Sequence, residues 1–456
     1  MTNIRRASEN IGPLSEGASF WQLSPFLVFV ATFLYLIVRY PALESARIDD
    51  FPLFACLLAT IWAFFTFRGR VSFNEKVEIF VSGAAQPTII YMCFIFIFSS
   101  IFAHFLTLTG GVDAMVGLGI SVIPTTMLLP GIFAVVSLFS FVIGSSIGTI
   151  TTFMPIAMGF MHSLCLDPTL LSGVVVCGAM LGDNLSVISD TTIAATQTLG
   201  CAPHDKLREN IKLAVPAFLA TAIILYWLGT GIDHCALWHD PAALSLANVI
   251  KIVPYGVVLA LALAGVDVLA VLVVGTMTAA LLGVAGGAFS PIFAITSIFD
   301  GFYASKKMVA VFVLVMMIAG LSKLIEANGG IDYLLRKFRE RINTTFGAEC
   351  SMSFLVLLVN AVIAKNTISI LTVGPIAQKV SDQFKVGRPR MASLLDIFAC
   401  ACQGIIPYSP QLLLAGALAQ VSSFSVMPYL YYQFFILIAA TCSIVWRHVA
   451  ANRCAA

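Results

Sequence analysis

The sequence predicts an all-α polytopic membrane protein with about ten transmembrane helices and two re-entrant hairpins, arranged as two inverted-topology repeats with broken helices at the midplane. Three observations carry this prediction: the composition, the length of the apolar stretches, and an internal repeat. Of 456 residues, 59% are hydrophobic and only 11% are charged, whereas a soluble domain carries about 25% charged residues. A net charge of +2 gives no support to nucleic-acid binding.

Apolar windows of roughly 17 residues or more are long enough to cross a bilayer as a helix. Ten such windows predict ten crossings, at residues 21–38, 51–67, 83–108, 169–200, 211–231, 245–264, 268–288, 308–326, 393–421 and 428–446. Two further apolar stretches, 130–162 and 352–380, are interrupted by Gly-Ser-Ser-Ile-Gly-Thr and by Lys-Asn-Thr. Such interruptions survive in a membrane only where protein or a wet cavity satisfies the backbone, so both stretches predict re-entrant hairpins.

The two halves of the chain are related by an offset of about 220 residues. Residues 137–157 align without gaps with residues 357–377, and eight of the 21 positions are identical. Duplication explains this similarity, since matching periods mark repeated units. We therefore expect a tail at 1–20, a first membrane repeat at 21–231 and a second at 245–446.

Positive charge predicts that the two copies face opposite sides of the membrane. No Lys or Arg occurs between Lys76 and Lys206, so the loops near 110–128 and 160–168 lack them. The matching loops of the second copy are basic, with Arg336, Lys337, Arg339, Arg341, Lys379, Lys385, Arg388 and Arg390. Because basic loops remain in the cytoplasm, we expect an inverted repeat, with both termini cytoplasmic.

The segment 182–192 places two carboxylates in an otherwise apolar span. An aspartate there costs about 3 kcal/mol on insertion scales and normally faces a pathway. An intact helix would hold Asp183 and Asp190 roughly 10 Å apart, but Ser and Thr residues favour a locally unwound chain. We predict a Na⁺/H⁺ site formed by Asp183 and Asp190 with hydroxyls of Ser186, Ser189 and Thr191, because hard cations prefer oxygen ligands. Helix caps and back-bonded hydroxyls are the alternative interpretation.

A second break, at residues 403–410, occupies the equivalent place in the second copy. Its prolines remove backbone donors and free carbonyl oxygens, so it can supply neutral ligands opposite the aspartates. The expected pathway residues are Asn184, Thr149, Lys365, Asn366, Gly404, Pro407 and Ser409. Lys365 is either a charge partner of the aspartates or a snorkelling lysine. Asp396 lies near a predicted span end, where we expect a solvated carboxylate.

The pattern Gly182-Asp183-x-Leu185-Ser186-x-Ile188-Ser189-Asp190-Thr191-Thr192 resembles the signature of the NhaC-type sodium/proton antiporter family. A Gly/Ser/Thr-rich segment ending in Pro155, together with Pro407-Tyr408-Ser409-Pro410, supports the resemblance over roughly residues 80–420. The resemblance implies a secondary transporter of the ion-transporter group in the bacterial inner membrane, exchanging Na⁺ for protons and forming a homodimer. Some relatives instead couple Na⁺ or H⁺ to small organic acids, which leaves a small organic anion as an alternative substrate.

Other function classes are less well supported by the residues. Intramembrane aspartyl proteases carry their aspartates in YD and GxGD motifs on two helices, whereas here both lie in one segment and residue 180 is Met. We therefore expect no enzyme activity and no cofactor beyond the transported Na⁺ and H⁺. A channel is harder to exclude, although broken helices in an inverted repeat favour alternating access.

Overall fold

A computed structural model describes residues 19–40, 50–69, 71–122, 124–164, 166–231, 245–304, 306–339 and 342–455. In these ranges all regular structure is helical, and nine helices, two of them broken, are long and apolar enough to cross a membrane. The predicted all-α polytopic membrane fold is therefore confirmed. The expected N-terminal tail lies almost entirely outside the described residues.

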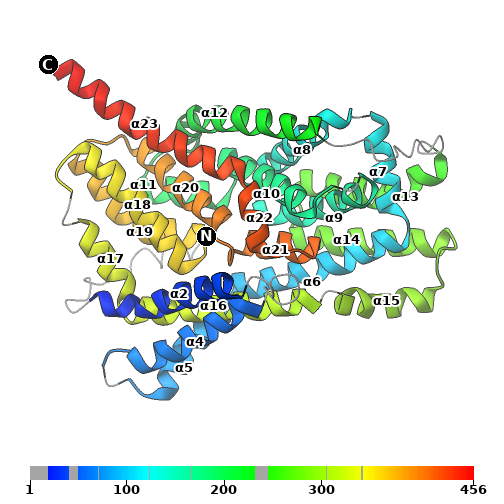
Figure 1. The fold of residues 1–456 in the computed structure, drawn as a ribbon, viewed down its shortest axis with the longest axis horizontal. Helices are drawn as coiled ribbons and strands as arrows, with labels where there is room; N and C mark the ends of the chain where they lie inside the picture. The colour runs from blue at the N-terminus through cyan, green and yellow to red at the C-terminus, as the bar shows by residue number, and fades with distance from the viewer. Residues whose placement is uncertain are drawn as a thin grey trace.

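The helices form two layers in the view of Figure 1. The lower layer contains α2 (Ser24–Arg39), α4 (Asp50–Thr66), α5 (Phe73–Ala84), α6 (Pro87–Leu108), α14 (Val268–Ala285), α15 (Pro291–Ala304) and α16 (Lys306–Ala327). The upper layer contains α8 (Leu128–Ile143), α9 (Ser146–Leu164), α10 (Pro168–Leu185), α11 (Asp190–Leu199), α12 (Pro203–Thr230), α18 (Thr345–Ile363), α19 (Asn366–Gln383), α20 (Arg388–Ile405), α21 (Pro410–Ala419), α22 (Ser423–Val426) and α23 (Tyr431–Ala455). Helices α7 (Gly111–Val122) and α13 (Leu246–Leu263) lie at the right-hand end, and α17 (Gly330–Arg339) lies at the left. Short 3-10 turns occur at η1 (Phe20–Leu23), η3 (Thr125–Met127) and η4 (Met427–Tyr429).

Several elements differ from the sequence prediction. The expected loop at 110–128 is mostly the helix α7, and α5, α15 and α17 were not predicted. These helices have 10 to 14 residues, which is too short to stand out in a search for spanning segments. The predicted crossing at 51–67 forms a helix of 17 residues, at the lower limit for spanning.

Both apolar stretches that were predicted as hairpins form two helices joined by a tight turn, and both tips contain a residue in the left-handed region. That these hairpins are re-entrant stays a prediction. Helix α8 ends at Gly144 with φ of 70°, and α18 ends at Ala364 with φ of 54°. These two residues are 220 positions apart. Because a left-handed alanine costs about 1–2 kcal/mol, the surrounding protein must hold the second tip in place.

The two predicted broken helices are also present, as α10 followed by α11 and α20 followed by α21. Each second segment begins after a serine whose hydroxyl caps the helix: Ser189 accepts from the Thr191 amide and Ser409 from the Leu412 amide. These serines are again 220 residues apart. The two hairpins lie toward opposite ends of the upper layer (Figure 1). The repeat is thus visible in matching helix ends, and its inverted orientation stays a prediction.

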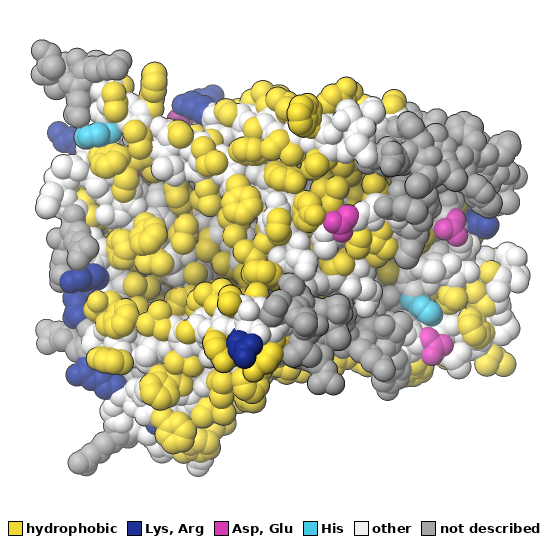
Figure 2. Space-filling model, in the orientation of Figure 1, with side chains coloured by type: hydrophobic (Ala, Val, Ile, Leu, Met, Phe, Trp, Pro, Cys, Tyr) yellow, Lys and Arg dark blue, Asp and Glu magenta, His cyan; other side chains and the backbone are white. Residues whose placement is uncertain are grey.

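The outer surface is apolar over most of the face seen in Figure 2. Large side chains such as Phe65, Trp227 and Leu281 are 82%, 79% and 67% exposed, which is expected where lipid replaces water as the solvent. Lys and Arg gather along the left edge, at the end where α17, α18 and α19 lie (Figures 1 and 2). We call this the basic end.

Candidate ion-binding site

Two glycines allow α10 to approach α8 unusually closely just before the break. A Cβ atom on Gly178 would lie 2.8 Å from the Val136 side chain, and one on Gly182 would lie 2.2 Å from the Ser137 carbonyl oxygen. Small residues spaced four apart are the usual means of close helix packing in membranes. The glycine of the Gly-Asp pair therefore sets the position of Asp183 against α8.

Asp183 lies in the last turn of α10 and is 2% exposed. The Ser189 hydroxyl donates to its carboxylate at 2.6 Å, and the Ser146 hydroxyl from the start of α9 interacts with it as well. This bond to Ser189 is possible only because the chain between α10 and α11 leaves the helical path, with Ser186 in an extended conformation. The break therefore brings two hydroxyls to a buried carboxylate.

Asp190 is the first residue of α11 and is exposed. Its carboxylate accepts a hydrogen bond of 2.7 Å from the Thr367 hydroxyl of α19, and a helix N-terminus favours negative charge. The two aspartates are close enough for their charges to interact. One carboxylate is thus accessible while the other is buried behind it.

Further hydroxyl groups line the break beside Asp183. The Ser189 hydroxyl lies 2.9 Å from the Thr191 hydroxyl, and the Thr192 hydroxyl donates to the Ser186 carbonyl at 2.7 Å. Within the described ranges no group of three His, Cys, Asp or Glu side chains gathers as a transition-metal site. An arrangement of carboxylates, hydroxyls and carbonyls suits hard cations.

The first hairpin tip covers the break between α10 and α11. A Cβ on Gly144 would lie 2.8 Å from Ile188 and 3.1 Å from the Ser186 hydroxyl. The second break is connected through side chains: Gln403 donates to Gln411 at 3.1 Å, and Gln411 donates to Ser146 at 3.3 Å. A chain of neutral amides therefore ends at the hydroxyl beside Asp183.

The predicted pathway residues lie in different places. Thr149 is fully buried, and its hydroxyl bonds the Ser145 carbonyl of its own turn. Asn366 begins α19 and donates to the Cys400 thiol at 3.4 Å. In the second break Pro407 and Ser409 are buried and Gly404 packs against Gln433, and among the described residues none of these three bonds the aspartates.

Lys365 is half-buried between α18 and α19. Its charge interacts with Asp190, although no ion pair within 4 Å joins the two in the described part of the chain. It lines a cavity of about 20 Å³ together with Tyr408 and Pro410. That volume holds about one water molecule, so Lys365 faces a small, mostly apolar space between its own layer and helices α6 and α16.

Sequence reasoning missed a charged cluster behind Asn184. Asp396 of α20 is 0% exposed and forms an ion pair of 2.6 Å with Lys206 of α12, so the expectation of a solvated Asp396 is wrong. The reason is that α12 covers this face of α20, and the partners are 190 residues apart. The Asn184 side chain donates to the Tyr432 hydroxyl, and the Asn184 backbone carbonyl accepts from Lys206 and Asn210.

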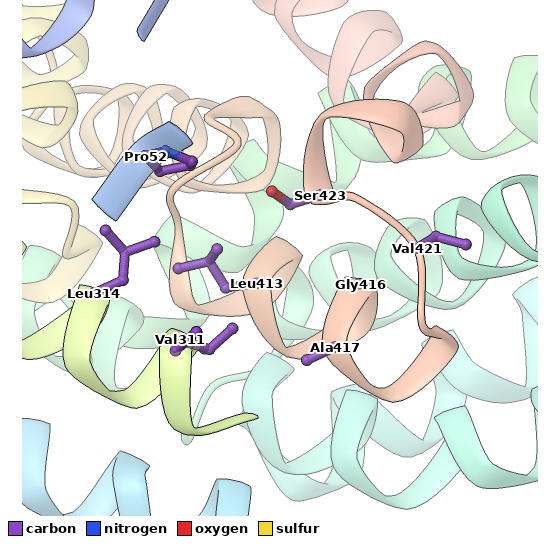
Figure 3. A pocket seen from close by; sticks show the side chains of 9 residues that line it. Pro52, Val311, Leu314, Leu413, Gly416, Ala417, Val421 and Ser423 are labelled. Atoms are coloured by element: carbon purple, nitrogen blue, oxygen red, sulfur yellow. The ribbon is translucent and has the colours of Figure 1, made fainter. Parts of the chain in front are cut away.

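Two cavities mark the boundary between the layers. A cavity of about 310 Å³ lies between α6, α7, α9 and α21 and is lined by His104, Asp113, Pro155 and Gln420 among others. A smaller one of about 10 Å³ separates α21 from α4 and α16 (Figure 3). Its walls are nearly all small or apolar, including Val311, Leu314, Gly416 and Ala417, so few polar contacts tie α21 to the lower layer there.

Comparison with known proteins adds family information to this geometry. The family model described as "Na+/H+ antiporter family" matches residues 7–231 and 235–449. The chain is 25% identical to the Na⁺/H⁺ antiporter NhaC of Alkalihalophilus pseudofirmus, over 87% of this chain and 89% of that protein. It is 23% identical to the Na⁺/H⁺ antiporter NhaC of Bacillus subtilis, over 74% and 79% of the two chains. It is also 21% identical to the malate-2H⁺/Na⁺-lactate antiporter of Bacillus subtilis, over 71% and 74%.

Proposed function

Because the chain belongs to the Na⁺/H⁺ antiporter family, we propose that it exchanges Na⁺ for protons across a bacterial inner membrane, using the site formed by Asp183 and Asp190. The observation that carries this proposal is the buried Asp183 carboxylate, which accepts from Ser189 at a helix break and whose charge interacts with a second, exposed carboxylate, Asp190. A buried carboxylate without a fixed cation must bind a proton or a metal ion.

Competition between the two ions couples their transport. Na⁺ needs ionised carboxylates together with hydroxyl and carbonyl oxygens, whereas protons neutralise the same carboxylates. Because interacting carboxylates titrate as a pair, loading one ion favours release of the other. Asp190 meets the ion first because it is exposed, and Asp183 then holds it away from water.

Alternating access is supported by the difference between the two ends of the upper layer. A cavity of about 310 Å³ lies beside the C-terminal parts of α9 and α21. The buried ion pair of Lys206 and Asp396 lies toward the other end, the basic end. The walls of the small cavity in Figure 3 are mostly apolar, so α21 can shift against α16 there without breaking polar contacts. We propose that the site opens to either end as the layers move.

Exchange in everted membrane vesicles tests the site. Asp183→Asn should reduce Na⁺-driven proton movement to the background level, because the buried charge is lost. Asp190→Asn should raise the half-saturating Na⁺ concentration by about tenfold or more, the effect of losing a charge-assisted contact of about 1.5 kcal/mol or more. Glu326→Gln removes an exposed carboxylate on α16 and serves as the control. Wild-type exchange by Asp183→Asn would refute the proposal.

We also propose that the basic end faces the cytoplasm, with both termini on that side. Single cysteines replacing Asp113 of α7 and Lys337 of α17, which are both exposed, should react from opposite sides of the membrane in a cysteine-free protein. Reaction of both from the same side would disprove the inverted repeat.

Transport of a small organic acid is the second candidate, because Lys365 places a cation beside Asp190. The cavity at Lys365 holds about one water molecule, which is too little space for an organic anion. Uptake of radiolabelled malate or lactate into proteoliposomes with an imposed Na⁺ or pH gradient separates the two. Uptake that Lys365→Gln abolishes, with Na⁺ binding retained, would favour the organic substrate.

A further inference from the structure

Five side chains from four helices form a buried cluster on the basic side of the candidate ion site. We call it the inner cluster, and its members are Asn184, Thr192, Lys206, Asn210 and Asp396. All five are at most 1% exposed. It lies toward the basic end, because α11 runs from Asp190 to Leu199, an added Cβ on the following Gly200 would lie 3.2 Å from the Arg388 guanidinium, and α12 begins at Pro203.

Oxygen atoms surround the Lys206 ammonium. It donates to the Asp396 carboxylate at 2.6 Å, to the Thr192 hydroxyl at 2.7 Å and to the Asn184 carbonyl at 3.3 Å. The break of α10 leaves this carbonyl without its usual helical donor, and a cation at a helix C-terminus is favourable. A carboxylate, a hydroxyl and a carbonyl are the ligand types that hard cations take.

Two more oxygens in the cluster accept no hydrogen bond from any residue that the structure describes. The Asn210 amide nitrogen donates to both Asp396, at 2.9 Å, and the Asn184 carbonyl, at 2.7 Å. This fixes the orientation of the amide, and the Asn210 Oδ1 atom then accepts no hydrogen bond from any described residue. Asn184 Oδ1 is likewise buried and without a donor in the described ranges. Buried polar atoms are normally satisfied, so these two oxygens leave the cluster with capacity to accept a ligand in addition to the three oxygens that hold the ammonium.

We propose that the inner cluster is a second cation site, in which the Lys206 ammonium stands where a Na⁺ ion would otherwise bind. Lys206 is then a resident cation that compensates the Asp396 charge while the pathway is closed at the basic end. Na⁺ that leaves Asp183 toward the basic end must compete with this ammonium for Asp396. The inference deepens the proposed exchange function and rests on it for its role in transport. The binding site itself can be tested without transport.

A simpler interpretation treats Lys206 and Asp396 as a structural pin between α12 and α20. Such a pin does not account for the unpartnered Asn184 and Asn210 oxygens. The two interpretations differ when the ammonium is removed. A pin leaves an uncompensated charge that no small ion relieves specifically, whereas a cation site accepts Na⁺ in place of the lysine.

The experiment is Na⁺-dependent thermal unfolding of purified full-length protein in detergent. The background is Asp183→Asn with Asp190→Asn, which removes the carboxylates of the candidate ion site, and choline replaces Na⁺ at constant ionic strength. Adding Lys206→Ala should restore a saturable rise of the melting temperature with Na⁺, since a ligand that binds only the native state stabilises it. Lys206→Arg keeps a resident cation and should show no such rise.

Asp396→Asn, added to the Lys206→Ala protein, should abolish the Na⁺-dependent rise. A folded Lys206→Ala protein without a Na⁺ response overturns the proposal, and so does a response that survives Asp396→Asn. Failure of the proposed exchange function would appear separately, as normal exchange by Asp183→Asn, and would leave this measurement unchanged.

A second measurement covers the case in which Lys206→Ala does not survive purification. The Cys400 thiol lies 3.6 Å from the Asp396 carboxylate. In membranes, with Cys400 as the single cysteine, Lys206→Ala should let a small cationic methanethiosulfonate react with this thiol, and Na⁺ should slow that reaction at least tenfold more than choline. Equal rates in Na⁺ and choline overturn the proposal.

Discussion

Gly182→Ala is the sharpest test of how packing positions the candidate ion site. The added Cβ would lie 2.2 Å from the Ser137 carbonyl oxygen and 2.4 Å from the Phe141 amide nitrogen. Both are backbone atoms of α8 and cannot rotate away. Real Cβ atoms essentially never approach closer than 3.0 Å, so α8 and α10 must separate by about 0.8 Å, the difference between 2.2 and 3.0 Å.

The expected energetic cost is about 1–3 kcal/mol, the range for overpacking a well-packed interior. Glycine-to-alanine substitution in a helix would otherwise stabilise by about 1 kcal/mol, so the sign of the change reports on the close contact. Separation of α8 from α10 also displaces Asp183 relative to Ser146, which begins α9 beyond the hairpin tip and supplies a hydroxyl to this carboxylate. Exchange should therefore fall more than stability alone explains.

Gly256→Ala on α13 is the matched control, because nothing lies within 4 Å of a Cβ at that position. Thermal unfolding in detergent and Na⁺/H⁺ exchange in vesicles should both be unaffected or slightly improved by the control. Equal melting temperatures and equal exchange rates for the two variants would refute the packing argument.

Three further predictions concern charged residues. Glu349→Ala leaves the buried Arg390 without its carboxylate at 3.5 Å and should destabilise the protein by about 3 kcal/mol, measured by thermal unfolding; an unchanged melting temperature would contradict this. Lys365→Gln removes a positive charge near Asp190, so Asp190 should hold both its proton and Na⁺ more strongly, and the pH optimum of exchange should move upward; an unchanged profile in vesicles would exclude a charge-partner role. The Arg388 guanidinium is bonded to Asp382 at 2.9 Å and lowers the pKa of this exposed carboxyl. The small stabilisation from the pair is therefore fully present above the pKa of the carboxyl in the unfolded chain, and it is lost as the pH falls through the pKa in the folded protein. Asp382→Asn should therefore reduce stability slightly at neutral pH and leave it unchanged once the pH lies below the lowered pKa of this carboxyl, which acid titration of the melting temperature can check.

The sequence was sufficient to predict the broken elements because the breaks have local causes. Glycine and serine at the first hairpin tip, the prolines at 407 and 410, and the serine caps all act within a few residues. Because the chain contains an internal repeat, a break found in one half indicated where to expect the matching break in the other half. The short helices α7 and α17 could not be predicted in this way, because their burial depends on tertiary contacts and not on a continuous apolar run.

The part of the site that the sequence could not reveal depends on distant partners. Asp396 and Lys206 each lie near the end of an apolar segment, where solvation is the ordinary expectation. Only the packing of α12 against α20 places the two together and away from water. Asp183 was recognisable as a buried charge because it lies well inside its span, where a carboxylate has no access to bulk water.

The two breaks share a backbone plan but differ in chemistry at equivalent positions. Asp183 and Asn184 correspond to Gln403 and Gly404 at the offset of 220 residues, while the capping serines are kept. A second acidic break facing the first would require additional cations to compensate buried charge. A neutral break avoids this requirement, and its amides still reach Asp183 through Gln411 and Ser146. The duplicated fold therefore supplies two broken helices, and only the first carries aspartates at its break, the charges that we propose bind the ion.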